Sequence, residues 1–231
     1  MKLALIGRSI AHSSSPLLYR KILGSEIQYD LIDIQDESQL PSLEELASRY
    51  QGINLTAPYK KFYLKDLKDV APEALSLNAI NTISLGPSSF RGINTDYFAT
   101  EAILIRFLHD YPKLHLLILG SGVMANLTKL LCEKYGISFN QVSRSNSENL
   151  SRLNVETFHQ AGSQLLIINA CSRNFIFQGH TTGEELFWDY NYKFLPHQNT
   201  LPFRIKSYWD GQEMLYLQAL HAAKFWRECW P

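Results

Sequence analysis

The segment LHLLILGSGVMA, residues 114–125, decides the class of fold. Its first six residues are apolar apart from His115, which is the pattern of a β-strand buried on both faces of a sheet. A glycine-serine-glycine turn follows, and residues 127–136 predict a helix that stops at Gly136. A buried strand that passes through glycines into a helix indicates a parallel sheet in an α/β protein.

Strand-like and helix-like segments alternate on both sides of this segment. Before it, apolar runs predict strands at residues 2–7, 27–34, 52–56, 79–85 and 90–94. After it, strands are predicted at residues 138–143, 164–170 and 185–192. The alternation favours a mostly parallel βαβ arrangement, to which a hairpin turn at Gly86-Pro87-Ser88-Ser89 adds an antiparallel piece.

Local signals mark the helices between the strands. Ser15 suits the N-cap of a helix because a proline follows it, and Pro41 and Pro58 open two further helices. Residues 97–111 carry apolar side chains at three-to-four spacing, which predicts another helix. The last helix is amphipathic and begins just after Gly211.

The length of 231 residues suits two domains of roughly 100 residues each. We place one domain at residues 1–97 and a second at residues 98–206, with a C-terminal helix at residues 207–231 that returns to the first lobe. Lys plus Arg equals Asp plus Glu at 22 each, so neither nucleic acid nor a membrane surface is an expected partner.

The cysteines and the N-terminus favour the cytoplasm. Cys132, Cys171 and Cys229 are odd in number and far apart, which indicates free thiols and no metal site. The first apolar run ends at Gly7 and is too short for a signal peptide or a membrane span. We expect a cytoplasmic protein that is a monomer or a homodimer.

The turn at Gly120, Ser121 and Gly122 suits a dinucleotide, because bare backbone lets a pyrophosphate approach a helix N-terminus. On this motif alone, cofactor binding and a structural β–α turn are equally good interpretations. The next strand ends at Ser143-Arg144-Ser145 without an acidic residue, which favours NADP over NAD if the segment is more than a polar loop.

Polar side chains also follow several strands of the first half. HSSSP (residues 12–16) places three hydroxyls at a helix N-terminus, where a carboxylate or phosphate can bind. Thr56 and Lys60 follow one strand, and Asn81 and Asp96 accompany the next two. Each alone suits a cap or turn, but strand ends of one sheet share an edge, so we expect these groups to converge.

In these motifs the chain resembles the shikimate dehydrogenase family. The shared motifs follow the family's order through most of the chain: IAHSSSP, NLTAPYK, AINT, NTD, GSG, SRS, NA, DYNY and DGQEML, then Gln218. The resemblance implies a substrate lobe, a Rossmann-like NADP-binding lobe and no metal. It also implies the reversible, NADPH-dependent reduction of 3-dehydroshikimate to shikimate in aromatic amino-acid biosynthesis.

The resemblance further implies a role for each matching residue. The catalytic pair is Lys60 and Asp96. The residues that bind the substrate are Ser13, Ser15, Thr56, Asn81, Tyr192 and Gln218. The residues that bind the cofactor are Gly120, Ser121, Gly122, Ser143, Arg144, Ser145, Gly211 and Met214.

Lys60 and Asp96 suit the proton side of a ketone reduction. A lysine ammonium beside the carbonyl oxygen stabilises the developing alkoxide and donates the proton, while a cofactor supplies hydride to the carbon. A nearby carboxylate favours the charged lysine. We therefore assign proton transfer to Lys60, and orientation and acceptance of a substrate hydroxyl to Asp96.

Four positions depart from the family pattern, mostly on the cofactor side. Val123 and Glu213 replace glycines, Cys171 replaces a threonine, and Tyr97 stands where a glycine usually follows NTD. Three interpretations stay open: an NADP-dependent shikimate dehydrogenase, a dehydrogenase of the same fold for quinate or another small hydroxy acid, and a non-catalytic shikimate-binding homologue. We adopt the first, because the substrate motifs are intact.

Overall fold

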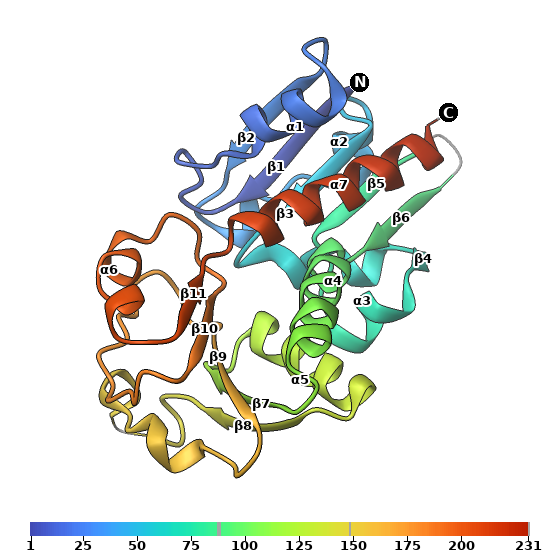
Figure 1. Ribbon diagram of the computed structural model, residues 1–231. Coiled ribbons are helices and arrows are strands. Elements are labelled where there is room, and N and C mark those ends of the chain that lie inside the picture. The colour runs from blue at the N-terminus through green and yellow to red at the C-terminus, as the bar shows by residue number, and fades with distance from the viewer. Residues whose placement is uncertain (87–88, 148, 231) are drawn as a thin grey trace. The chain divides into compact units, whose positions relative to one another are not determined.

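The computed structural model describes residues 1–86, 89–147 and 149–230 of the chain. The chain divides into two compact units, Met1–Ala99 with Tyr216–Pro231, and Thr100–Leu215. Each unit has its own sheet, which confirms the predicted α/β fold with two lobes (Figure 1). Residues 207–215, which the sequence grouped with the last helix, lie in the second unit.

The first unit contains a six-stranded sheet of order β2-β1-β3-β5-β6-β4. Its strands are β1 (Lys2–Gly7), β2 (Gln28–Asp33), β3 (Gly52–Leu55), β4 (Asp69–Val70), β5 (Thr82–Leu85) and β6 (Phe90–Ile93). β1 pairs in parallel with β2 and β3, and β4 with β6, whereas β5 is antiparallel to both of its neighbours. The predicted hairpin is β5–β6, and residues 87 and 88 of its turn lie outside the described residues.

The helices of the first unit differ in detail from the prediction. They are α1 (Ser15–Leu23), α2 (Leu43–Ala47), α3 (Pro72–Leu77), and the 3₁₀ helices η1 (Glu37–Gln39) and η2 (Tyr59–Asp66). The N-cap of α1 is Ser14, so the prediction of Ser15 was one residue late. The reason is local: the Ser13 hydroxyl accepts the N–H of Ser15, and Ser14 already has helical backbone angles. Pro58 opens the 3₁₀ helix η2 rather than an α-helix.

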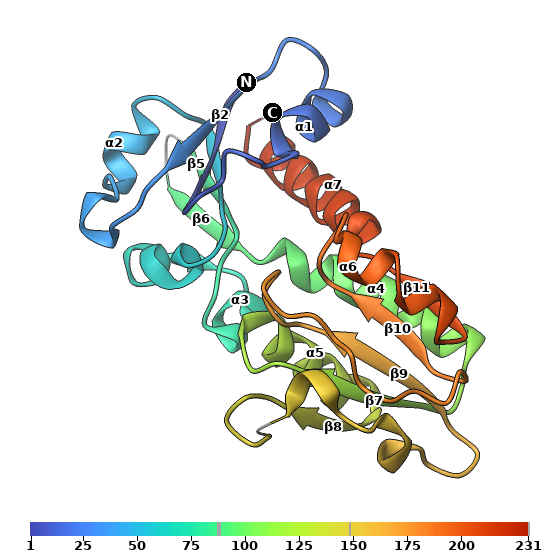
Figure 2. The ribbon, with the colours of Figure 1, turned by 90° about the vertical axis from the view of Figure 1, so that its left-hand side faces the viewer.

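Side chains of β1 alternate between two cores, one on each face of the sheet. Ala4 and Ile6 pack with α2 and η2, whereas Leu3 and Leu5 pack with α1 and the last helix, α7 (Gln212–Cys229). Trp226 of α7 has no exposed surface, and its Nε1 donates to the carbonyl of Ile83 at 3.0 Å. Both views show α7 lying along this sheet (Figures 1 and 2), so the predicted return of the last helix to the first lobe is confirmed.

The second unit contains a wholly parallel sheet of order β11-β10-β9-β7-β8 (Figure 2). Its strands are β7 (Leu114–Leu119), β8 (Ser138–Val142), β9 (Gln164–Asn169), β10 (Leu186–Asp189) and β11 (Ser207–Trp209). Its helices are α5 (Val123–Tyr135), α6 (Leu195–Gln198), η3 (Leu150–Arg152), η4 (Val155–Phe158) and η5 (Leu201–Phe203). α4 (Thr95–Asp110) begins in the first unit and continues into the second.

The strand that decided the class of fold is buried throughout, as its apolar pattern predicted. The imidazole of His115 is satisfied by hydrogen bonds to Ser138 and Asn140 of the neighbouring strand. α5 ends at Tyr135, and its C-cap Gly136 has a φ of +63°, a left-handed conformation that glycine adopts readily. Among the described residues, no helix combines the length and apolar character needed to cross a membrane.

Candidate functional site

The first unit brings Lys60 and Asp96 into direct contact. Lys60 lies at the start of η2, which follows β3, and Asp96 lies in the first turn of α4, which follows β6. The Lys60 Nζ and Asp96 Oδ2 atoms are 2.6 Å apart, and the two side chains are only 17% and 12% exposed. A charge-assisted hydrogen bond of this length is among the stronger polar contacts in a protein. The catalytic role of the pair stays a prediction.

Asn81 is fixed beside this ion pair by its side-chain oxygen. Its Oδ1 accepts the backbone N–H of Thr95 at 2.7 Å and lies 3.1 Å from the hydroxyls of Thr82 and Thr95. Thr95 immediately precedes Asp96, and the N–H of Ile80 donates to the carbonyl of Lys60 at 2.7 Å. The Asn81 amide nitrogen donates to no other described residue, so it can donate to a ligand hydroxyl.

Thr95 extends this group to α7. Its hydroxyl lies 3.2 Å from Oε1 of Gln218, and it is fully buried. Thr95 therefore aligns two of the residues that we expect to bind the ring hydroxyls of the substrate, Asn81 and Gln218. Sequence reasoning did not select Thr95, although its place inside the NTD motif was a usable signal.

The hydroxyl groups predicted to hold a substrate lie at neighbouring strand ends of the same sheet. Ser13 and Ser15 follow β1, and their hydroxyls are 3.1 Å apart. Thr56 follows β3, the parallel neighbour of β1, and packs so closely on Gly7 that a Cβ there would lie 2.3 Å from its methyl group. The Thr56 hydroxyl bonds to no described residue, which leaves it available to a ligand.

The second unit contains a hollow of about 620 Å³ near the carboxyl ends of β7, β8 and β9. The residues that line it are Gly120, Ser121, Gly122, Ser143, Arg144, Ser145, Leu150, Ala170, Cys171, Ser172, Asn174 and Phe175. Six of the eight predicted cofactor residues belong to this set, and Gly211 and Met214 do not. The two strand-end motifs of the sequence therefore share one hollow.

The turn after β7 offers bare backbone to this hollow. Gly120 has a φ of +113°, and a Cβ there would lie 3.1 Å from the carbonyl oxygen of Ala170, so only glycine fits without strain. Gly122 caps α5, and a Cβ there would meet no atom within 4 Å. The N-terminus of α5 is thus open to an anion. Val123, the β-branched departure, does not line the hollow.

Arg144 is exposed at the hollow and bonds to no described residue, by hydrogen bond or ion pair. The hydroxyls of Ser143 and Ser145 flank it and lie 2.7 Å apart. Asn146 holds the loop in place, because its Oδ1 accepts the N–H of Ser143 at 2.6 Å. An unpaired guanidinium beside two hydroxyls suits a phosphate monoester.

Glu213, a second departure from the family pattern, does not carry an unbalanced charge. Its Oε2 lies 2.5 Å from the guanidinium of Arg106 in α4. The hydrogen bond to Glu213 raises the pKa of Arg106, against the lowering effect of burial. The charge that Glu213 introduces in place of a glycine is therefore paired with an arginine on a neighbouring helix.

Cys171, the third departure on the cofactor side, lines the hollow. Burial raises the pKa of its thiol to about 11, although the positive charge of Arg144 acts in the opposite direction. The thiol is thus neutral at pH 7 and resembles a small apolar side chain. Within the described part of the chain, no cluster of His, Cys, Asp and Glu could hold a metal ion.

The remaining predicted residues have structural partners in the second unit. A Cβ at Gly211 would lie 2.3 Å from the carbonyl oxygen of Tyr190, so packing alone requires glycine there. Met214 is buried, with its sulfur 3.5 Å from the hydroxyl of Thr100. Tyr192 accepts a hydrogen bond from Arg173 through its carbonyl at 2.7 Å. The cofactor and substrate roles of these three residues stay predictions.

Residues 5–83 match the family model of the shikimate dehydrogenase substrate binding domain. A shikimate dehydrogenase (NADP(+)) of a bovine strain of Staphylococcus aureus is 28% identical over 197 residues, 73% of each chain. Over residues 5–83 the chain is similar to the substrate binding domain of shikimate dehydrogenases. A relative of the same name from another Staphylococcus aureus strain is 28% identical over 171 residues. That alignment spans 64% of this chain and 63% of the relative, which is less than two thirds of the relative's length.

Solved shikimate dehydrogenases share the fold over nearly the whole chain. The Aquifex aeolicus structure has a TM-score of 0.77 at 21% identity and covers 99% of this chain and 93% of its own. The Thermus thermophilus structure, in complex with NADP(H) and shikimate, has a TM-score of 0.71 at 22% identity, with coverage of 99% and 94%. At these sequence identities the similarity establishes the fold only. Any assignment of a reaction must be argued from the residues of this chain.

Proposed function

We propose that this chain catalyses the reversible, NADPH-dependent reduction of 3-dehydroshikimate to shikimate. The observation that carries the proposal is the 2.6 Å contact between Lys60 Nζ and Asp96 Oδ2 beside the side chain of Asn81. The names of the Staphylococcus aureus relatives support NADP as the cofactor, and the Thermus thermophilus complex supports shikimate as the ligand.

The hollow of the second unit fits the cofactor. Gly120 admits the close approach of a pyrophosphate, and the open N-terminus of α5 favours its negative charge. Arg144, with Ser143 and Ser145, suits the 2′-phosphate that distinguishes NADP from NAD. When NADPH is bound, it supplies the hydride for the carbonyl carbon.

Lys60 handles the proton of the reaction. In the reduction, its ammonium stabilises the charge that develops on the carbonyl oxygen and donates a proton to that oxygen. In the oxidation of shikimate, the neutral amine takes the proton from the hydroxyl. Asp96 holds Nζ in place and accepts a hydrogen bond from a substrate hydroxyl. Without this positioning, the lysine side chain would also occupy rotamers in which its amine cannot reach the reacting oxygen.

The substrate is held by neutral polar groups. We assign its carboxylate to the hydroxyls of Ser13 and Ser15, with Tyr192 assisting. We assign its ring hydroxyls to the Thr56 hydroxyl, the Asn81 amide nitrogen and Gln218. A polyhydroxylated acid presents this set of donors and acceptors, whereas an apolar ketone would leave the Asn81 amide unpaired, at a cost of about 1–3 kcal/mol.

The test is a panel of acids and nucleotides. Purified protein is given shikimate or quinate with NADP or NAD, and the near-ultraviolet absorbance of the reduced nucleotide is followed. The proposal expects the highest kcat/KM for shikimate with NADP. A higher kcat/KM for quinate would instead indicate a quinate dehydrogenase of the same fold. Failure of both nucleotides to bind in a titration would overturn the proposal and leave a shikimate-binding homologue.

We further propose a cytoplasmic enzyme that is a monomer or a homodimer. Its three cysteines form no disulfide in the structure, which suits a reducing compartment. Analytical ultracentrifugation measures the mass of the assembly, and any larger oligomer would contradict this part of the proposal.

A further inference from the structure

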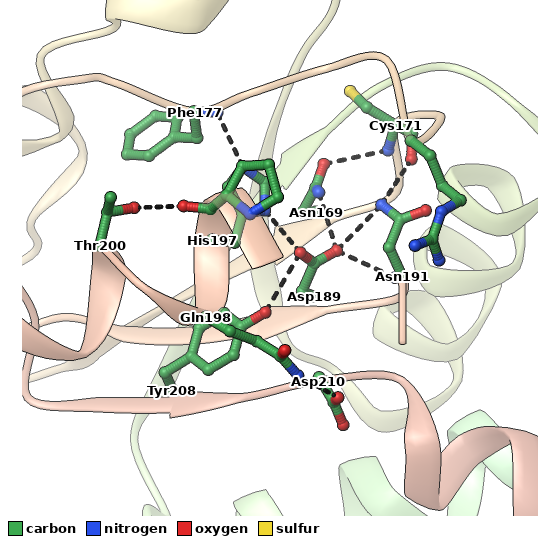
Figure 3. Close-up of polar contacts among 12 residues, drawn as sticks. Asn169, Cys171, Phe177, Asp189, Asn191, His197, Gln198, Thr200, Tyr208 and Asp210 are labelled. Carbon is green, nitrogen blue, oxygen red and sulfur yellow. Dashed lines mark hydrogen bonds and ion pairs between the residues drawn. The ribbon is translucent and has the colours of Figure 1, made fainter. Parts of the chain in front are cut away.

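Asp189 is a carboxylate with no exposed surface at the end of β10, and several donors converge on it (Figure 3). Its Oδ1 accepts a hydrogen bond from Nδ2 of Asn169 at 2.9 Å. The same oxygen accepts hydrogen bonds from the backbone N–H of Asn191 at 2.9 Å and from its Nδ2 at 3.0 Å. Its Oδ2 lies 2.5 Å from Nδ1 of His197 and 3.4 Å from the hydroxyl of Tyr208.

His197 has no exposed surface either, and its hydrogen bonds define its tautomer. The backbone N–H of Phe177 donates to Nε2 at 2.9 Å, so Nε2 carries no proton. Nδ1 therefore carries the ring proton and donates it to Asp189. Since solvent reaches neither side chain, the pair cannot meet a substrate, and its effect must pass through the residues that it holds.

Asn169 and Asn191 carry that effect to Cys171. Oδ1 of Asn169 accepts the N–H of Cys171 at 3.2 Å, and Nδ2 of Asn191 donates to the Cys171 carbonyl at 3.1 Å. Both asparagine side chains are bonded to Asp189 at the same time. Cys171 lines the hollow of about 620 Å³, together with its neighbours Ala170 and Ser172. Asn169 and Asn191 thus link Asp189 to Cys171 (Figure 3), and Cys171 forms part of the wall of the hollow.

We propose that Asp189, held by His197, is a positioning residue for dinucleotide binding and sets the Cys171 wall of the hollow through Asn169 and Asn191. This inference rests on the proposed function, in which the hollow binds NADPH. The donors that converge on Asp189 need an acceptor at both oxygens. An amide would direct its own N–H groups at some of these donors and leave them unpaired.

NADPH titration of three variants tests the proposal. Asp189→Asn should weaken NADPH binding by about tenfold or more, because buried donors lose their acceptor. His197→Gln keeps one donor and one acceptor, so it should lose less affinity than His197→Leu. In each of these variants, the affinity for shikimate should fall by less than the affinity for NADPH, since most of the proposed shikimate contacts lie in the first unit.

Thiol alkylation, mapped by mass spectrometry, reports on the wall without any cofactor. Cys171 is partly buried, whereas Cys132 in the same unit has no exposed surface. A wall that loosens locally raises the modification rate of Cys171 relative to that of Cys132. Global unfolding raises both rates, so the ratio separates positioning from a loss of stability.

Glu185→Gln is the matched control. Glu185 is also a buried carboxylate, it precedes the first residue of β10, and its Oε1 lies 2.9 Å from Nε2 of His159. Loss of this pair should lower the melting temperature and leave both the NADPH affinity and the thiol ratio unchanged. Glu185 bonds to Thr182 and Gly183, neither of which lines the hollow.

Unchanged NADPH affinity and an unchanged thiol ratio in folded Asp189→Asn would overturn the proposal. If Asp189→Asn does not fold, the NADPH affinities of His197→Gln and His197→Leu decide instead. Equal affinities in these two variants would overturn the proposal. A wild-type protein that binds no NADPH contradicts the proposed function instead. In that case the ratio of the Cys171 and Cys132 alkylation rates still shows whether Asp189 holds the Cys171 segment in position.

Discussion

The ion pair of Lys60 with Asp96 has the same 2.6 Å separation as that of Arg91 with Asp69, but only the former is shielded from water. The side chains are 17% and 12% exposed in the first pair, and 46% and 54% in the second. Exposed pairs contribute little, because water and salt screen them. This contrast gives a matched control for the catalytic proposal.

Lys60→Ala should lower kcat for shikimate oxidation by roughly 10²-fold or more, the contribution of general acid–base catalysis. Arg91→Ala removes the exposed pair of equal length and should leave kcat unchanged. Steady-state kinetics with NADP measure both variants, and circular dichroism checks that each is folded. Near-normal turnover in Lys60→Ala would contradict the assignment of the proton to this amine.

Arg144→Ala should raise KM for NADP by about tenfold or more and leave KM for NAD nearly unchanged. The reason is that a charge-assisted contact to a phosphate is worth about 1.5–3 kcal/mol, and NAD lacks that phosphate. Arg152→Ala is the control, because Arg152 is exposed in the same unit but does not line the hollow. Equal losses with both nucleotides would show that Arg144 does not read the 2′-phosphate.

Gly52→Ala should destabilise the protein by about 1–3 kcal/mol, the usual cost of overpacking. The added Cβ would lie 2.3 Å from Nε1 of Trp226. In a Trp226→Phe background the penalty should shrink, because the smaller ring leaves room for the methyl group. Chemical denaturation of the four proteins in this double-mutant cycle measures the coupling, and strictly additive effects would refute the contact.

The stability of the wild type should fall more steeply with acid than that of Glu185→Gln. Burial acts to raise the pKa of Glu185, but hydrogen bonds from Thr182 and His159 outweigh it, and the net shift is downward from 4.5. Its contribution is thus present above pH 4.5 and is lost as pH falls through the lower folded-state pKa.

Thermal unfolding between about pH 6 and about pH 3 checks this difference in slope. Glu184→Gln changes the exposed neighbour and should follow the wild-type curve. Parallel curves for the wild type and Glu185→Gln would contradict the downward shift. The comparison isolates one carboxylate from the general acid sensitivity of the fold.

The sequence predicts most strands of both sheets because their apolar runs are long enough to show a pattern, and some end at a glycine, as β1 does at Gly7. Leu114–Leu119 is the clearest case, since every residue of that strand is buried. Short elements escape such reasoning: Asp69–Val70 and Ser207–Trp209 are held by pairing to Arg91–Gly92 and Leu186–Trp188, not by a local pattern. Elements of two or three residues have no periodicity to detect.

The site divides in the same way. Gly120 and Lys60 could be selected from sequence, because a turn after a strand and a lysine at a strand end have local signatures. Thr95 lies inside the NTD motif, but its bond to Asn81 joins residues distant in the chain and has no local signature. The same holds for the bond between Asp189 and Asn169. The balance of Glu213 by Arg106 also needs the packing of two helices that the sequence does not place together.

The first unit is discontinuous, and this has a consequence for how the chain is made. Residues Tyr216–Pro231 complete a unit that begins at Met1, while Thr100–Leu215 forms the other unit without them. Domains fold as units during synthesis. The whole second unit therefore emerges from the ribosome before Trp226. Leu3 and Leu5, which α1 covers in part, lack their contact with α7 until Trp226 has emerged. The unit that contains Lys60 and Asp96 thus completes its core after the second unit has been synthesised.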